Sequence, residues 1–385
     1  MLGCAPAIVL ALWLAVHRVP GFGPLVADAL RAVFGKEFVA WLEDTAYGVQ
    51  DFVNRKLRRE RPTEPAWDVD EGMAPQAPAP QASVPSPAAS SSVGGEPGAP
   101  SAPAFTRTNV APMLPAIAAK GEGVWVPMID VRKPELPARM LKTFLHPDEH
   151  RSWAVIAVVA VDLEHVELRL MAGRYEPESR TPESKSYARP AVVPEADRPS
   201  LLAAFNGGYK TTHGDYGMKL DGVTLVVPRG RACAVGKLVG GGYAIRSWEA
   251  LREREGELAW VRQTPLCMYE EGKANPALEM SKLGWGASSV SGTTVIRRSA
   301  IGLDATGKVL FVGVGDFLTG KTLAHAMHHA GSADVAQLDV NFSFPKFVTY
   351  DANLKAIPLT KNFEFEEDQY VGRRAERDFF YLVHK

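Results

Sequence analysis

One pattern in the sequence has the residues needed to bind a nucleotide phosphate. Gly315 to Thr322 read Gly-Asp-Phe-Leu-Thr-Gly-Lys-Thr, which satisfies G-x-x-x-x-G-K-[ST], with an expected strand before and an expected helix after. In such a loop Lys321 would contact the β- and γ-phosphates and Thr322 would hold Mg²⁺. However, the loop lies too close to the C-terminus for the strand–helix units that normally follow it, and the sequence before it does not alternate strands and helices. A P-loop nucleotide-binding protein is therefore the less favoured interpretation.

A second pattern has the spacing of a metal site. His325 and His329 stand one helical turn apart, as do the zinc ligands that one helix can supply. The metalloprotease form of this motif needs Glu directly after the first His, and Ala326 occupies that place. Polar histidines on a half-buried helix explain the pattern better, so we predict no metal and no other cofactor.

Three separate segments place polar residues at the ends of apolar runs. Residues 201–209 read Leu-Leu-Ala-Ala-Phe-Asn-Gly-Gly-Tyr, and a glycine-bounded hairpin follows at 217–222. Residues 298–302 read Arg-Ser-Ala-Ile-Gly. Residues 331–343 end in Leu-Asp-Val-Asn-Phe-Ser, with Asp339 directly after an apolar strand.

In order and approximate spacing these segments resemble the blocks of the phosphodiester glycosidase family, over roughly residues 150–350. The family has Asn-Gly-Gly-Phe, Arg-(Thr/Ser)-Ala-Ile-Gly and Asp-Gly-Gly-Gly-Ser at the corresponding places. Here Asp339 and Ser343 are kept, whereas Val340 and Phe342 replace glycines that permit positive φ and close substrate approach. The resemblance implies a hydrolase that acts on a sugar phosphodiester or an envelope glycan. The altered motif leaves a second possibility, a catalytically altered relative that binds glycans on the cell envelope.

The resemblance and the chemistry of acetal cleavage together suggest a role for each candidate. A leaving phosphate needs little protonation, so cations and N–H donors can stabilise it directly, and the planar fork of Arg298 suits that task. Asp339 would be the nucleophile or base, or else a carboxylate that caps the following turn. Asn206 would bind a sugar hydroxyl or adopt a left-handed turn, and His213 would be a general acid or a solvated loop residue. The remaining candidates, all for substrate binding, are Gly207, Gly208, Lys219, Asp316, Asn341 and Ser343.

Short apolar runs bounded by turn residues must position these groups. Residues 153–162 and 166–172 are predicted to be paired strands, and residues 217–227 a hairpin that turns at Asp221-Gly222 with type I′ geometry. Helices are expected at 249–257 and 321–330, and further strands at 295–303, 309–314, 335–339 and 378–383. Strands dominate, which predicts an α+β domain around a mixed, mainly antiparallel sheet with few helices.

The N-terminal third differs in composition from this body. Residues 1–19 are apolar as far as His17 and are predicted to be a membrane anchor or signal-like segment, or else a buried helix. Residues 20–61 carry apolar side chains at three- and four-residue steps and end in a basic run. This predicts an amphipathic helix that lies against anionic headgroups, or a plain helix with a basic end. Residues 62–108, rich in Pro, Ala and Ser, predict a disordered linker, and residues 109–385 the phosphodiester glycosidase-like domain.

The charge and cysteine content of the chain limit the classes of partner and the compartment that we expect for it. The chain of 385 residues has 43 Lys and Arg against 44 Asp and Glu, a net charge of −1, which argues against a nucleic-acid partner. Cys233 and Cys267 either form a pair in an oxidising compartment or remain partly buried thiols. The combined prediction is a membrane-anchored hydrolase whose globular domain is extracytoplasmic and whose substrate is a carbohydrate or sugar phosphate.

Overall fold

The computed structural model describes residues 26, 30, 33–58, 63–69, 103–280, 292–340 and 342–385. The predicted anchor at 1–19, most of the predicted linker and Asn341 lie outside the described residues. Two parts of the linker region contact the body. The Trp67 ring meets Phe144 edge-on at a centroid distance of 5.2 Å, and the amide of Phe105 donates to the Ala138 carbonyl.

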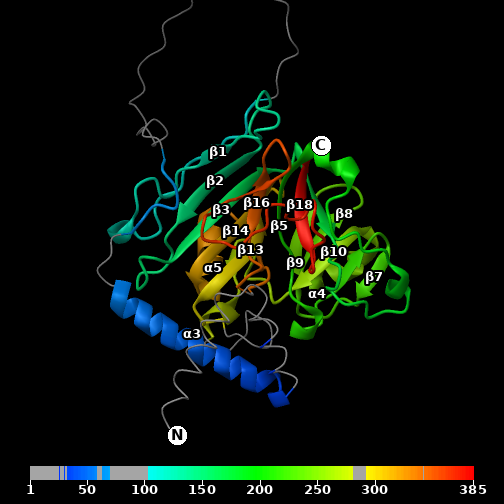
Figure 1. Cartoon of the computed structure of the whole chain (residues 1–385), viewed down its shortest axis with the longest axis horizontal. Helices are drawn as coiled ribbons and strands as arrows, with labels where there is room; N and C mark the ends of the chain where they lie inside the picture. The colour runs from blue at the N-terminus through cyan, green and yellow to red at the C-terminus, as the bar shows by residue number, and fades with distance from the viewer. Residues whose placement is uncertain are drawn as a thin grey trace, which may run out of the picture.

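Strands of the body form three sheets (Figure 1). The largest has the order β1-β2-β3-β14-β13-β15-β11-β12. Its strands are β1 (Val126–Met128), β2 (Met140–Leu145), β3 (Val155–Asp162), β11 (Tyr269–Glu270), β12 (Lys273–Ala274), β13 (Ile296–Leu303), β14 (Val309–Leu318) and β15 (Asp334–Gln337).

The two other sheets have five strands each. One has the order β7-β6-β10-β8-β9, from β6 (Met218–Leu220), β7 (Val223–Val226), β8 (Cys233–Leu238), β9 (Tyr243–Ser247) and β10 (Leu258–Thr264). The other has the order β17-β16-β5-β18-β4, from β4 (Val166–Met171), β5 (Leu201–Asn206), β16 (Phe347–Tyr350), β17 (Ala356–Pro358) and β18 (Phe379–His384). Within these sheets each described strand pair is antiparallel, so the predicted α+β class with mainly antiparallel sheets is confirmed.

Helices are few and mostly short. The α-helices with given bounds are α3 (Lys36–Arg58), α4 (Trp248–Leu251) and α5 (Gly320–His329). The 3-10 helices are η2 (Pro115–Ile117), η3 (Glu183–Ser186), η4 (Glu195–Ser200), η5 (Thr211–His213), η6 (Arg252–Glu257) and η7 (Pro276–Glu279). Within the described ranges, no helix combines the length and apolar character that a membrane crossing requires.

Strand β3 shows why the core has two layers. Its apolar run is buried on both faces, because successive side chains point to opposite sides of a strand. Val159 and Val161 pack into the core that the three sheets share, whereas Ile156 and Val158 pack with α5 on the opposite face. The large sheet is therefore covered on one side by the smaller sheets and on the other by α5 (Figure 1).

Two sequence expectations about local pairing had different outcomes. Strands β3 and β4 are not paired with each other: β3 pairs with β2 and β14, and β4 pairs with β18 in another sheet. That prediction was wrong because adjacency in the chain favours pairing but does not require it. The hairpin of β6 and β7 is confirmed, with φ of 53° at Asp221 and 77° at Gly222, the pair of positive values that a type I′ turn requires.

The structure contains a disulfide between Cys233 and Cys267. It joins the start of β8 to the segment that follows β10, and both residues are buried. Of the two possibilities open for these cysteines, the structure has the pair.

Candidate functional site

Asn206 and Asp339 lie together where β5 and β15 end. The Asn206 Nδ2 donates to Ser299 Oγ at 2.9 Å, and that hydroxyl donates to the Asp339 carbonyl at 3.0 Å. The Asp339 amide in turn donates to the Gly207 carbonyl at 3.1 Å. Asn206 Oδ1 accepts from the Lys346 amide, and the φ of Asn206 is not positive, so the left-handed turn considered above does not occur. Asn206 thus positions the polypeptide around Asp339.

Gly207 and Gly208 are required by close packing. The Gly208 amide donates to Asp378 Oδ2 at 2.9 Å, and a Cβ on Gly208 would lie only 2.7 Å from the Arg262 Cζ. A Cβ on Gly207 would overlap the same Asp378 carboxylate. Arg262 and Asp378 are fully buried and joined by two hydrogen bonds, from Nε at 2.8 Å and Nη2 at 3.1 Å. This buried pair fixes the backbone beside the candidate site.

The carboxylate of Asp339 is held by Arg377, which directly precedes Asp378 in the sequence. Arg377 Nη1 donates to Asp339 Oδ2, and the guanidinium lies over the Phe344 ring at 3.5 Å from the centroid. Asp339 is 1% exposed and Arg377 4%. Among the described residues, Arg377 Nη2 has no hydrogen-bond partner.

Two more cations lie close to this pair. Arg297 donates to the Phe342 carbonyl at 3.0 Å and to Asp316 Oδ2 at 3.2 Å, and it lies over the Phe342 ring at 4.0 Å. Lys346 is 8% exposed, with Nζ 3.4 Å from Gln369 Oε1. The pKa of the Lys346 ammonium is lowered to about 8, mainly by burial; Arg297 and Arg377 act in the same direction, and Glu364 and Glu366 oppose them. We call Arg297, Lys346 and Arg377 the cationic cluster.

Arg298 faces the other side of the large sheet. Its Nε donates to the Leu318 carbonyl at 2.9 Å, Nη2 to the Thr294 carbonyl at 2.9 Å and Nη1 to Gln337 Oε1 at 3.0 Å. Because side chains alternate along β13, Ser299 faces Asn206 and Arg298 points away from it. Burial lowers the pKa of Arg298 to about 10. The structure therefore brings Asn206 and Asp339 together and leaves Arg298 to hold strand ends.

Other predicted candidates are distributed around the molecule. Lys219 lies opposite Val261 of β10 and pairs with Glu255 of η6 at 3.6 Å, whereas the neighbouring Met218 lies opposite Arg262. His213 is buried in η5, whose first residue, Thr211, donates from its amide and hydroxyl to Glu176. Asp316 and Ser343 do lie at the site. Asp316 pairs with Arg297, and half-buried Ser343 lies between the two phenylalanines that stack on the cations.

The residues of the phosphate-loop pattern serve the start of α5. Thr319 and Thr322 form a reciprocal capping box, and Lys321 Nζ pairs with Glu279 at 2.7 Å on the surface. His325 Nδ1 is 2.7 Å from the Tyr269 hydroxyl, and His329 Nε2 is 2.6 Å from the Ala111 carbonyl. The groups that would bind a nucleotide or a metal thus have local structural partners.

Helix α3 packs beside the candidate site. Tyr47 packs against the apolar group of Tyr209, Ile296 and Val340. Burial raises the pKa of the Tyr47 hydroxyl to about 12, with the nearby charges of Glu43 and Asp316 acting in the same direction. Val340 fills space in this group.

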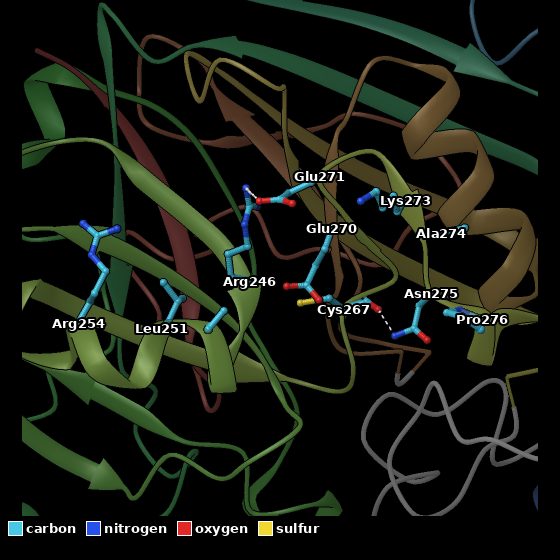
Figure 2. A pocket seen from close by; sticks show the side chains of 11 residues that line it. Arg246, Leu251, Arg254, Cys267, Glu270, Glu271, Lys273, Ala274, Asn275 and Pro276 are labelled. Atoms are coloured by element: carbon cyan, nitrogen blue, oxygen red, sulfur yellow. Dashed lines mark hydrogen bonds and ion pairs between the residues drawn. The ribbon is translucent and has the colours of Figure 1, made fainter.

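An open pocket of about 530 Å³ lies elsewhere, between the ends of β9, β11 and β12 (Figure 2). Arg246 reaches over it toward Glu271 at 3.8 Å and also pairs with Asp334, while Glu270 accepts from the Ser247 amide at 2.7 Å. Arg254 on its rim pairs with Glu257. Arg246 and Arg254 of this pocket thus both have acidic partners.

Sequence reasoning missed Ser299, Arg297, Lys346 and Arg377. Two signals could have found some of them. Strand alternation places Arg298 and Ser299 on opposite faces, and two charged residues, Arg377 and Asp378, directly precede the buried strand β18.

No protein-family model matches the chain, and no curated protein matches it. Among solved structures it is similar to the zebrafish N-acetylglucosamine-1-phosphodiester alpha-N-acetylglucosaminidase catalytic domain, auto-inhibited by pro-peptide. That similarity has 15% identity and a TM-score of 0.41, and covers 68% of this chain and 88% of that chain. A hypothetical protein from Synechocystis is also similar, with 8% identity and a TM-score of 0.33, covering 60% of this chain and 59% of that chain. At these identities the likeness is one of fold, and it is partial.

Proposed function

We propose that the chain is a membrane-tethered hydrolase of the phosphodiester glycosidase type, which acts on a sugar phosphodiester or an envelope glycan. The observation that carries this proposal is the cationic cluster around the carboxylate of Asp339. Buried guanidinium and ammonium groups favour an anionic ligand, and Arg377 Nη2 still has a donor to offer.

In the proposed hydrolysis the cationic cluster would stabilise the leaving group, and Asp339 would act as the general base. The anomeric C–O bond breaks, and the phosphate monoester leaves with the bonding electron pair, stabilised by the cluster. Water supplies the new anomeric hydroxyl and gives its proton to Asp339, which passes it to solvent. Arg297 and Arg377 take the phosphate-binding role that the sequence suggested for Arg298, because Arg298 is bonded to main-chain carbonyls on the opposite face.

The proposed location is the outer side of a membrane. The buried disulfide supports an oxidising compartment, and the apolar residues 1–16 support a tether.

Release of free sugar from a panel of sugar-1-phosphodiesters by the full-length chain tests the reaction. Asp339→Asn is expected to lower the rate by at least about 10²-fold, the range of a lost general base. Asp334→Asn is the matched control, since Asp334 is also buried, pairs with Arg246 and begins β15, the strand that Asp339 follows. It is expected to retain activity. Full activity of Asp339→Asn would refute the assignment.

The alternative function is glycan binding without turnover, favoured by Val340 and Phe342 at the glycine positions of the motif. Its signature is retention on an immobilised envelope glycan with no sugar release from any member of the panel. Arg377→Met should then weaken retention.

A further inference from the structure

Helix α3 packs on the body through a face that carries Asp44, Asp51 and Tyr47, so most of its contacts are polar. Asp44 Oδ1 accepts from Thr294 Oγ1 at 2.6 Å, and Asp51 accepts from both Nε and Nη2 of Arg151 at 2.7 Å. Near the C-terminal end, the Arg58 guanidinium lies over the Phe317 ring at 5.2 Å. An amphipathic helix on a globular domain normally buries its apolar face instead.

The opposite face of α3 is apolar and exposed. Its members recur at three- and four-residue steps, so they form one stripe. With their exposed fractions they are Phe38 41%, Trp41 61%, Leu42 39%, Val49 59%, Phe52 53%, Val53 44% and Leu57 71%. Phe34, just before the helix, continues the stripe, with its ring 5.1 Å from that of Phe38. We call this the outer face of α3. Contiguous exposed patches of this kind mark interaction sites.

Charge on the helix identifies the partner. From Phe38 to Leu57, the exposed residues include Arg55 and Lys56 but no Asp or Glu. Asp44 and Asp51 bond to the body, and Glu43 is half-buried with its charge near Tyr47. Lys56 Nζ lies 5.0 Å from the Phe52 ring centroid, so a positive group borders the apolar stripe. Aromatic and aliphatic side chains edged by basic ones are the composition of helices that lie in the headgroup region of anionic bilayers.

We infer that the outer face of α3 binds an anionic lipid bilayer, with the helix lying in the plane of the membrane. The apolar residues 1–16 precede α3 by a short stretch of chain, so both segments can reach the same bilayer. The Tyr47 face, which packs beside the candidate site, points away from the outer face. This inference does not depend on the proposed reaction.

The inference can be tested by measuring how deeply a spin label on the full-length chain enters a lipid bilayer. In a Cys4→Ser background, Val49→Cys carries a nitroxide on the outer face, and Val239→Cys, 71% exposed at the end of β8, carries it on the body as the matched control. Vesicles of phosphatidylcholine with phosphatidylglycerol are expected to raise the oxygen accessibility of the label at position 49 and to lower its accessibility to a water-soluble nickel complex. The label at position 239 is expected to keep its solution values. Adding Lys56→Glu should weaken the effect on these vesicles more than on pure phosphatidylcholine.

Three results would overturn the inference. A label at position 49 that stays accessible to nickel while the chain sediments with vesicles would assign binding to the N-terminal segment alone. A label shielded from nickel in dilute solution without vesicles would show that the chain's own residues cover the outer face. Concentration-dependent dipolar broadening between labels at position 49 would assign the face to a second copy of the chain.

Discussion

Arg377 and Asp339 form a buried ion pair, and the Arg377 guanidinium is at the same time stacked on Phe344. The pair joins the loop after β15 to the residue that precedes Asp378, which itself pairs with Arg262. The candidate carboxylate and the Gly207-Gly208 turn therefore share one support. Removing one member of such a pair leaves a buried charge without compensation.

Arg377→Met is therefore expected to lower the free energy of unfolding by about 3 kcal/mol, the cost of an uncompensated buried charge. Adding Asp339→Asn to that variant should recover part of the loss, because the remaining group is neutral, while hydrolysis stays absent. Urea denaturation of the two single variants and the double variant gives the coupling energy between Arg377 and Asp339. Strictly additive effects would contradict a direct pair.

Lys346 makes stability depend on pH in a defined direction. Its pKa is lowered to about 8 from 10.5, so between these values the unfolded chain binds more protons than the folded chain. Stability should then rise with pH in this window, by up to roughly 3 kcal/mol from this residue. The unfolding free energy of Lys346→Met should exceed that of the wild type most at about pH 7, and the difference should shrink by about pH 9.5.

The binding of inorganic phosphate provides a second measure of the protonation state of Lys346. An anion in the cationic cluster needs the charged ammonium, so phosphate affinity of the wild type should fall as pH rises through about 8. The Lys346→Met variant should bind more weakly and lack this step. Equal pH profiles for the two proteins, measured by calorimetric titration, would place the phosphate elsewhere.

Gly208→Ala is expected to destabilise the fold by about 2 kcal/mol, since the new Cβ would lie 2.7 Å from Arg262, whose guanidinium is fully buried and hydrogen-bonded. Gly240→Ala is the matched control, because open space surrounds its Cβ and its φ is not positive. The free energy of unfolding of Gly240→Ala should stay within about 0.5 kcal/mol of the wild-type value. The measurement is the urea denaturation midpoint of each variant. Equal midpoints would argue against close packing of Gly208 on Arg262.

Loss of the disulfide should lower stability by about 3–4 kcal/mol, from a chain-entropy estimate for the 34-residue separation of Cys233 and Cys267. The Cys233→Ala, Cys267→Ala double variant and the reduced wild type should show the same lowered urea midpoint. A wild type whose midpoint does not respond to reductant would contradict a contribution of the bond to stability.

Several elements could be predicted from local sequence. The β6–β7 hairpin follows from Asp221-Gly222, since few residue pairs adopt two positive φ values easily. Helix α5 follows from Thr319 and Thr322, which cap it, and from its apolar spacing. Candidate Asp339 follows from a carboxylate placed directly after an apolar strand, and Asn206 from the same pattern at β5.

Local sequence was enough to predict strands at 295–303, 309–314 and 378–383, the α5 helix and the amphipathic character of α3, because period and capping are local properties of the chain. The packing of the sheets, by contrast, placed β3 and β4 in different sheets, put Arg297 and Arg377 beside Asp339 while Arg298 faces away, and turned the polar face of α3 inward. Each of these outcomes depends on contacts between residues far apart in the chain. Such contacts are set by how the sheets pack, which the pattern within a single segment does not encode.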